Sequence, residues 1–252
     1  MTELVGILNV TPDSFSDGGT WNESSAAIGR AKTLLAEGAA YVDIGAESTR
    51  PGAEPLRPDE EWRRLEPVLG GLAASGLRFS IDTYHPQTVE RGKALFDDFI
   101  VNDVTGLHDP AMQAAVARFG LRCIASHLPA AAHGDIQAAH KKEQHVTTEQ
   151  QVVDELGEKI ELLVTRGIRR ANIIVDPGIG FGKTPELNVR LLEFAKHFPQ
   201  HETMIGYSRK RFLGEQRMEL APNLAAGRVA VASGAAYLRV HDVAGHKQLL
   251  GA

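Results

Sequence analysis

The sequence predicts a parallel (β/α)8 TIM barrel, an α/β fold, formed by one domain over residues 1–252. Eight short apolar runs recur along the chain, and a longer amphipathic segment follows each of them. Such alternation implies a parallel sheet, whose strands are covered on both faces and are therefore continuously apolar. The length of 252 residues matches the roughly 250 that eight β/α units need. An open doubly wound sheet is the main alternative, and eight units in this length favour closure.

The expected strands and helices alternate from end to end, with no linker between them. The strands are expected at 4–8, 40–44, 78–81, 98–101, 121–125, 171–175, 202–206 and 236–240, and the helices at 23–37, 58–74, 86–95, 110–119, 148–166, 186–197, 223–234 and 243–250. Proline and acidic residues open several of the helices, where they suit the first turn and the helix dipole. The stretch 128–146 is expected to be a mobile loop after the fifth strand.

Composition and charge exclude several classes of protein. The net charge is −5 with both signs interspersed, whereas a nucleic-acid binder usually carries a basic stripe. No apolar run approaches the roughly 20 residues that span a bilayer, and no signal peptide opens the chain. The single cysteine, Cys123, lies in an apolar run and is expected to be buried. We therefore expect a cytoplasmic protein that binds neither nucleic acid nor membrane.

Polar residues stand at the end of every expected strand. In a barrel of this kind the active site lies at the carboxyl ends of the strands. A helix cap or turn would explain any one of these residues, but caps and turns would scatter them to both ends of the barrel. The residues that end the eight strands in order are Asn9, Asp43, Asp82, Asn102, Ser126, Asp176, Ser208 and His241.

The residue types indicate a substrate with a heterocyclic ring and a phosphate. Asp82, Asn102 and Asp176 can accept from the N–H edge of a heterocycle through charge-assisted bonds, and Lys210 supplies a donor. Arg239 and His241 belong to the eighth strand end, where barrels often bind phosphate. The run PGIGFGKT (177–184) ends like a nucleotide P-loop, but proline stands where the first glycine is required, so nucleotide hydrolysis is excluded.

Seven segments together resemble the dihydropteroate synthase family. They are GILNVTPDSFSDGG (6–19), ESTRPGA (47–53), SIDT (80–83), VNDV (101–104), DPGIGFGKT (176–184), SRK (208–210) and RVHDV (239–243), in the family's order. The resemblance runs from about residue 5 to 243. It implies condensation of 6-hydroxymethyl-7,8-dihydropterin diphosphate with p-aminobenzoate, with release of diphosphate, in folate biosynthesis.

The resemblance also implies roles for individual residues. Asp82, Asn102, Asp176 and Lys210 would hold the pterin, Asn9 would bind Mg²⁺ on the diphosphate, and Arg239 and His241 would contact its oxygens. The family is thought to lose diphosphate first, leaving a cation delocalised into the pterin. Carboxylates would stabilise that cation, and metal, Arg and His the leaving anion.

Two loops, 11–23 and 46–58, are expected to be flexible lids. They are rich in Gly, Pro, Ser and Asp, and a cation exposed to water would be hydrolysed unless a lid excluded it. By resemblance, the aminobenzoate pocket would be formed by Phe15, Thr49, Arg50 and Pro51, with Phe181 and Ser208 nearby.

Three departures from the family pattern leave alternatives open. Arg211 stands where many members have serine, beside the aminobenzoate carboxylate, and either pairs with it or turns outward. Leu128 replaces a methionine after the fifth strand and would change one wall of the pterin pocket. The stretch from Lys210 to Arg239 is shorter than usual and the last helix is brief. Members commonly dimerise through their final helices, so a homodimer is expected.

Two other functions are weighed against the synthase. A methyltransferase domain that binds methyltetrahydrofolate shares the Asp and Asn of the pterin site, but it has no use for Lys210 or for the NVTPDSFSDGG lid. A non-catalytic pterin-binding paralogue is suggested by Arg211 and Leu128.

Overall fold

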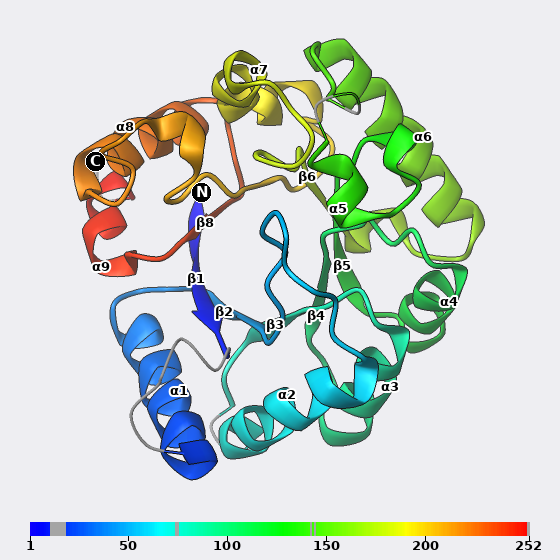
Figure 1. Ribbon diagram of the computed structural model, residues 1–252, viewed down its shortest axis with the longest axis vertical. Helices are drawn as coiled ribbons and strands as arrows, with labels where there is room; N and C mark the ends of the chain where they lie inside the picture. Colours follow the sequence, from blue (N-terminus) through cyan, green and yellow to red (C-terminus); the bar gives the residue numbers. More distant parts are fainter. Residues whose placement is uncertain (11–18, 74–75, 142, 144, 251–252) are drawn as a thin grey trace.

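Eight parallel strands form one sheet that curls into a barrel, as the sequence predicts (Figure 1). The computed structural model describes residues 1–10, 19–73, 76–141, 143 and 145–250. The strands are β1 (Glu3–Asn9), β2 (Tyr41–Gly45), β3 (Phe79–Asp82), β4 (Ile100–Asp103), β5 (Arg122–Ser126), β6 (Ile173–Asp176), β7 (Met204–Ile205) and β8 (Tyr237–Val240). Their order in the sheet is β6-β5-β4-β3-β2-β1-β8-β7. A parallel bridge between Val175 and Thr203 closes the ring from β6 to β7.

The helices surround the barrel (Figure 1). They are α1 (Gly19–Ala36), α2 (Pro58–Ala73), α3 (Pro86–Leu95), α4 (Pro110–Phe119), α5 (Ile136–Ala139), α6 (Glu149–Thr165), α7 (Pro185–Arg190), α8 (Leu220–Ala232) and α9 (Val243–His246). In the described part of the chain, no helix is long and apolar enough to cross a membrane.

Four expected elements differ from the structure. The loop expected at 11–23 overlaps a helix, because α1 begins at Gly19, and the helix expected at 243–250 is divided into α9 and a 3-10 helix, η7 (Lys247–Leu249). The helix expected at 186–197 is divided into α7 and a 3-10 helix, η5 (Leu191–His197). The stretch 128–146, expected to be an irregular loop, contains a 3-10 turn, η2 (Ala130–Ala132), and helix α5. Asp135 caps α5 by accepting from the backbone N–H groups of Gln137 and Ala138 at 2.8 and 3.0 Å. This local cap makes a short helix possible without an amphipathic repeat.

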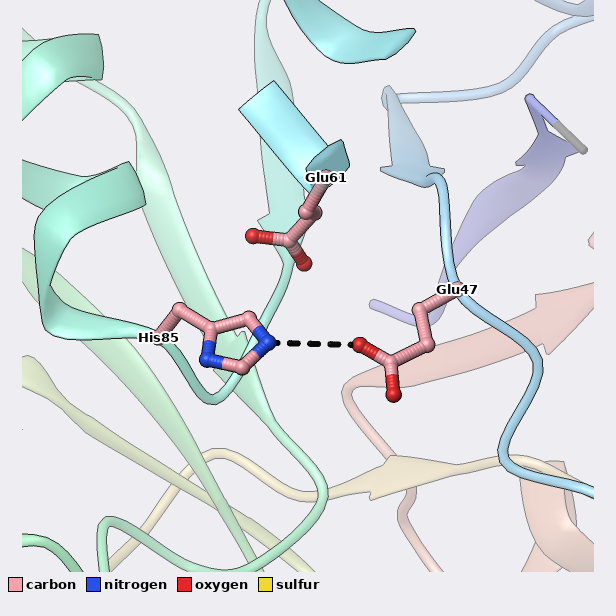
Figure 2. Close-up of side chains that lie close together, drawn as sticks. All are labelled: Glu47, Glu61 and His85. Carbon is pink, nitrogen blue, oxygen red and sulfur yellow. Dashed lines mark ion pairs between the residues drawn. The ribbon is translucent and has the colours of Figure 1, made fainter. Parts of the chain in front are cut away.

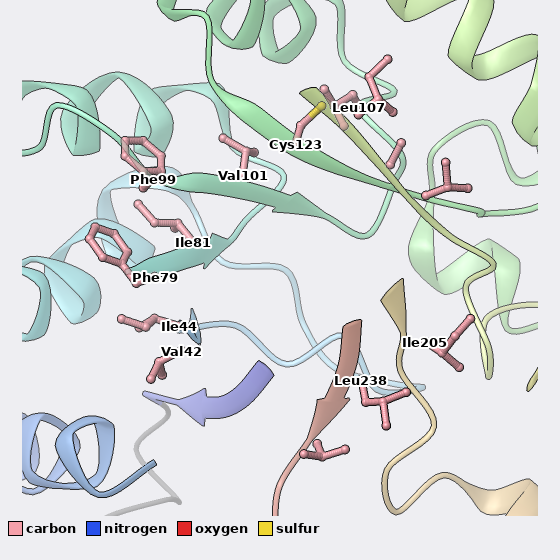
Figure 3. Packing of buried hydrophobic residues seen from close by; sticks show 14 of the residues in the cluster. Val42, Ile44, Phe79, Ile81, Phe99, Val101, Leu107, Cys123, Ile205 and Leu238 are labelled. Atoms are coloured by element: carbon pink, nitrogen blue, oxygen red, sulfur yellow. The ribbon is translucent and has the colours of Figure 1, made fainter. Parts of the chain in front are cut away.

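The main core lies between the sheet and the helices. Val42 and Ile44 of β2 and Phe79 and Ile81 of β3 point to this face (Figure 3). Cys123 of β5 is fully buried in the same cluster, as predicted, and burial raises the pKa of its thiol to about 12. The thiol is therefore an inert part of the packing.

The barrel interior holds a second apolar cluster at its base. It comprises Val5, Tyr41, Ile124, Ile174, Met204 and Tyr237. Side chains alternate between the two faces of a strand, so the residues two positions farther along point into the same interior nearer the carboxyl ends. Those residues include Asp43 above Tyr41, and Arg239 above Tyr237. The apolar base thus supports a polar layer above it.

Candidate active site

A charged network crosses the polar layer of the barrel. The Arg239 side chain donates from Nε to Asp43 Oδ2 at 2.6 Å and from Nη2 to Asp82 Oδ2 at 2.7 Å. Asn102 Nδ2 donates to the same Asp43 oxygen at 3.0 Å, and the Ser80 hydroxyl donates to the other oxygen. Three predicted residues, Asp82, Asn102 and Arg239, are therefore brought together by a fully buried carboxylate to which sequence reasoning gave no role.

The network sets unusual proton affinities. Burial and the neighbouring Asp43 raise the pKa of Asp82 to about 7, although Arg239 acts in the opposite direction. Burial alone would lower the pKa of Arg239, but Asp43 and Asp82 outweigh it and hold that pKa above its usual value. Arg239 is a permanent cation here, and Asp82 is a carboxyl group that can change its protonation near neutral pH.

Asp176 and Lys210 form the second part of the site. A Cβ added at Gly206 would lie 3.8 Å from both Asp176 Oδ2 and Lys210 Nζ, so the two groups flank a position that has no side chain. Burial raises the pKa of Asp176 while Lys210 opposes the rise. Burial lowers the pKa of Lys210 to about 8, against the effect of Asp176. The Lys210 ammonium donates to the Ile179 carbonyl, which leaves it two further protons for a ligand.

His241 lies in a strongly positive region beside Ser208. Its Nδ1 is 3.0 Å from Ser208 Oγ, and its backbone N–H donates to the same oxygen at 3.3 Å. Burial, followed by the charges of Arg209, Arg239 and Arg50, lowers the pKa of His241 to about 3. The imidazole is neutral, and the guanidinium groups around it create a potential that favours an anion.

The backbone next to this region is held in an uncommon conformation. Arg209 has a φ of 60°, a left-handed conformation that non-glycine residues seldom adopt. Its backbone N–H donates to Asn223 Oδ1 of α8 at 2.9 Å. The Asn223 amide in turn donates to the carbonyls of Arg217 and Glu219 at 2.8 and 2.6 Å. Helix α8 thereby positions the Ser208–Arg209–Lys210 turn.

Asn9 stands at the carboxyl end of β1, beside the charged network. It is exposed, and it pairs in register with Gly45 at the end of β2. Its amide oxygen is a hard donor of the kind that Mg²⁺ prefers, and Mg²⁺ on a phosphate needs only one or two protein ligands. The position and donor type of Asn9 fit such an ion.

The loop between β2 and α2 is attached to the segment around α5. Gln137 donates to the Arg50 carbonyl at 3.1 Å and accepts from the Gly52 N–H at 2.8 Å. His140 Nε2 is 3.1 Å from the Thr49 carbonyl oxygen. Residues 49–52, expected to be part of a lid, therefore have specific contacts across the mouth of the barrel.

Phe181 connects this loop region with the second part of the site. Its ring centroid is 5.7 Å from that of His140 and 5.2 Å from Lys210 Nζ, a cation–π distance. Pro51 is exposed at the edge of the β2–α2 loop, and Arg211 is exposed in η6 (Arg211–Leu213). Phe15 lies outside the described residues.

In the segment after β5, the side chains contact one another and the neighbouring loop. Lys183 is buried and donates to His127 Nδ1 at 2.8 Å and to the Phe181 carbonyl at 2.8 Å. Since Nδ1 accepts, the proton of His127 lies on Nε2, which faces Glu155 Oε2 at 3.1 Å. Lys183 therefore stabilises its own loop, consistent with the exclusion of a P-loop. Leu128 lines a separate cavity of about 380 Å³ next to α6.

Three contributors were given no role of their own by sequence reasoning. Asp43 carried a signal, because it is a lone carboxylate in the otherwise apolar run YVDIG. Arg209 also carried one, because it lies within the Ser-Arg-Lys motif. Gln137 gave none, because its role depends on how a loop more than eighty residues earlier folds beside it.

Comparisons with known proteins give matches over nearly the whole chain. The family described as pterin binding enzyme matches residues 5–241. A protein of Neisseria meningitidis serogroup C named dihydropteroate synthase is 37% identical over 259 residues, which cover 96% of this chain and 88% of that protein. The structure of Xanthomonas albilineans dihydropteroate synthase with 4-aminobenzoic acid superposes with a TM-score of 0.86 at 37% identity, over 99% of this chain and 90% of that one. The same enzyme in complex with 7,8-dihydropteroate gives a TM-score of 0.83 at 35% identity, over 99% and 91%.

Proposed function

This chain belongs to the dihydropteroate synthase family. We propose that the site at the carboxyl end of its barrel performs the condensation that defines that family. The enzyme joins 6-hydroxymethyl-7,8-dihydropterin diphosphate to p-aminobenzoate and releases 7,8-dihydropteroate and diphosphate. One observation supports this proposal most strongly. The Arg239 network and the Asp176–Lys210 pair lie side by side at one end of the barrel.

We assign the pterin to Asp82, Asn102, Asp176 and Lys210. Asp176 and Asn102 suit the N–H edge of the pterin, while Lys210 donates to a ring oxygen or nitrogen. Departure of diphosphate breaks the bond between carbon and oxygen at the hydroxymethyl group and leaves a positive charge delocalised into the ring. Asp82 and Asp176, already positioned, stabilise that charge without reorganisation.

The diphosphate is assigned to the positive region around His241. Arg239 is a permanent cation, and Arg50 and Arg209 act on the same region. A neutral His241 donates one N–H to a phosphate oxygen. Asn9 would hold Mg²⁺, which when bound neutralises charge on the leaving diphosphate.

The aminobenzoate is assigned to the β2–α2 loop and Phe181. Thr49, Arg50 and Pro51 would form one wall, with Phe181 and Ser208 nearby and Phe15 contributed by the preceding loop. The amine attacks the cationic carbon, a C–N bond forms, and the amine proton is lost to solvent. Arg211, exposed at the edge, either pairs with the carboxylate or stays in solvent.

Purified protein supplied with Mg²⁺ and both substrates tests the proposal. We expect stoichiometric dihydropteroate and diphosphate, and we expect Lys210→Ala and Asp176→Ala each to reduce kcat/KM by about a hundredfold or more, since each removes a charge positioned for the transition state. Circular dichroism should show both variants folded. A near-normal rate in either variant would remove that residue from the site, and a protein that binds pterin without turnover would be the non-catalytic paralogue.

A homodimer is proposed on the surface of α8. Leu220 and Val229 of this helix and Met218 just before it are 36%, 38% and 61% exposed, and such an apolar group is typical of an interface. We expect Val229→Glu to yield monomers in light scattering, and Leu95→Glu, on the exposed face of α3, to leave the dimer intact. Wild-type monomers at micromolar concentration would contradict the proposal.

A cytoplasmic location is also proposed. The buried, unpaired Cys123 suits a reducing compartment. Fractionation of cells that express the protein would check this.

A further inference from the structure

Three ionisable side chains converge outside the network that holds the substrates. Glu47 follows β2, Glu61 lies in the first turn of α2, and His85 precedes α3 (Figure 2). One ligand atom from each lies within 4.8 Å of the other two. His85 Nε2 lies 3.4 Å from Glu47 Oε2 and forms an ion pair with it. Residues from three separate segments thus form one compact group.

Each of the three residues has a side-chain atom that is shielded from solvent and has no hydrogen bond among the described residues, although two of these atoms form the ion pair at 3.4 Å. They are Glu47 Oε2, Glu61 Oε1 and His85 Nε2. Glu61 is 0% exposed, and the Glu47 side chain is 7% exposed. A buried polar atom without a partner costs free energy, so three of them facing one another indicate a ligand that would satisfy all three.

The opposite oxygen of each carboxylate is held firmly by donors. Glu61 Oε2 accepts from the hydroxyls of Thr83, at 2.8 Å, and Thr88. Glu47 Oε1 accepts from the Tyr84 hydroxyl and from the Leu56 N–H at 3.2 Å. Such donors orient a carboxylate so that one oxygen remains for a metal.

Protons and a metal ion would compete for the same three atoms. An N–H at His85 Nε2 can serve only one of the two carboxylates, so the other needs a donor or a cation of its own. A protonated Glu61 could supply that donor, and a bound metal ion would have to displace its proton. A divalent cation contacts all three atoms and neutralises both carboxylates.

We propose that Glu47, Glu61 and His85 form a binding site for a first-row divalent metal ion such as Zn²⁺. Imidazole nitrogen together with carboxylate oxygen suits this class, whereas Mg²⁺ prefers an oxygen-only shell. Zn–N and Zn–O bonds of about 2.1 Å place two tetrahedral ligand atoms about 3.4 Å apart, which agrees with the separation of Glu47 and His85. The ion is additional to the Mg²⁺ proposed on the diphosphate.

A metal ion bound at this position would affect the structure around it. Glu47 precedes Thr49 and Arg50 in the β2–α2 loop, whereas Glu61 and His85 belong to the starts of α2 and α3. A bound ion would tie the loop to these two helices and hold the wall assigned to aminobenzoate. Metal occupancy would therefore slow local opening of residues 46–57.

Calorimetric titration of the chelator-stripped protein with Zn²⁺, in excess Mg²⁺ and without substrates, tests the site. We expect one tight site per chain in the wild type and a loss of affinity of at least about tenfold in His85→Gln and in Glu61→Gln. His197→Gln is the matched control, because His197 Nε2 also lies 3.3 Å from a carboxylate, that of Glu149. In the described residues that pair belongs to no group of three ligands, so its loss should leave the tight site unchanged.

Two further measurements keep the test independent of catalysis. Co²⁺ should give visible absorption bands with the wild type that His85→Gln lacks, and Zn²⁺ should slow hydrogen exchange in residues 46–57. If Glu61→Gln fails to fold, His85→Gln decides, because its side chain is only partly buried. No tight Zn²⁺ site in the wild type, or wild-type affinity in His85→Gln, would overturn the proposal and leave an imidazolium between the two glutamates.

Discussion

Asp43 lies on β2 and Arg239 lies on β8, and their side chains form an ion pair. Asp43 is fully buried, and its oxygens are occupied by Ser80, Asn102 and Arg239. A buried charge is tolerated only when it is paired and hydrogen-bonded in this way. The pair aligns the guanidinium with Asp82. Residues that were predicted separately for the pterin and the diphosphate are thus parts of one network.

The pKa of Lys210 predicts how the rate of the reaction depends on pH. Burial lowers its pKa to about 8, so the side chain is a cation below that pH and neutral above it. The pterin contact needs its N–H donors and its charge, so kcat/KM for the pterin substrate should fall as the pH rises through about 8 in free enzyme. Steady-state rates from pH 6 to 10 would check this.

Lys210→Arg serves as the comparison. A guanidinium stays charged over this range, so whatever activity remains in this variant should lack the alkaline limb. An identical limb in both proteins would assign the titration to another group.

The turns that carry the site depend on close backbone approach. Gly178, in the loop after β6, has a φ of 64°, and a Cβ there would lie 2.0 Å from the His127 carbonyl oxygen. Only glycine fits this approach. The loop is thereby pressed against the end of β5, which places Ile179 below Lys210. The position of the loop after β6 therefore depends on Gly178 having no side chain.

A pair of glycine substitutions separates this contact from simple backbone strain. Gly120 ends α4 with a φ of 65° and has nothing within 4 Å of an added Cβ. Gly120→Ala should therefore cost only the left-handed penalty of about 1–2 kcal/mol. Gly178→Ala should cost clearly more, because the loop must also move. Urea unfolding of both variants would measure the difference, and equal costs would show that the close approach has no energetic weight.

At the scale of the whole molecule, buried histidines make the fold sensitive to acid. Burial lowers the pKa of His127 to about 4, and the nearby charge of Lys183 acts in the same direction. Burial, with the surrounding arginines, lowers that of His241 to about 3. Both are neutral when folded but titrate near 6.5 when unfolded. The unfolded chain therefore binds more protons between about pH 6.5 and 4, and the stability that these groups give above 6.5 is lost as pH falls through that window.

The His127→Gln variant isolates one of these groups. The free energy of unfolding should decrease from pH 7 to pH 5 in the wild type, and by less in the variant, because one proton fewer is taken up on unfolding. Denaturant titrations at both values would check this. An equal decrease would mean that His127 contributes nothing to the acid response.

The fold was predictable because its signal is local and repeated. Continuous apolar runs separated by amphipathic segments located all eight strands, with ends that differ from the structure by at most two residues. The helix expected at 186–197 was predicted as one element, because the pattern of apolar residues does not distinguish α7 from the 3-10 helix η5. The expected loop 128–146 contains α5 because a single Asp135 cap determines it.

The sequence by itself determined the barrel, the end of it that carries the site, and the residue types gathered there, because each follows from periodicity or from short motifs along the chain. Only the tertiary structure decided which groups pair. The contact of Arg239 with Asp43 and Asp82, the attachment of Gln137 to Arg50, and the convergence of Glu47, Glu61 and His85 all join residues far apart in sequence. Such pairings depend on strand register and on the closure of the barrel, which bring side chains within bonding distance only after the whole chain has folded.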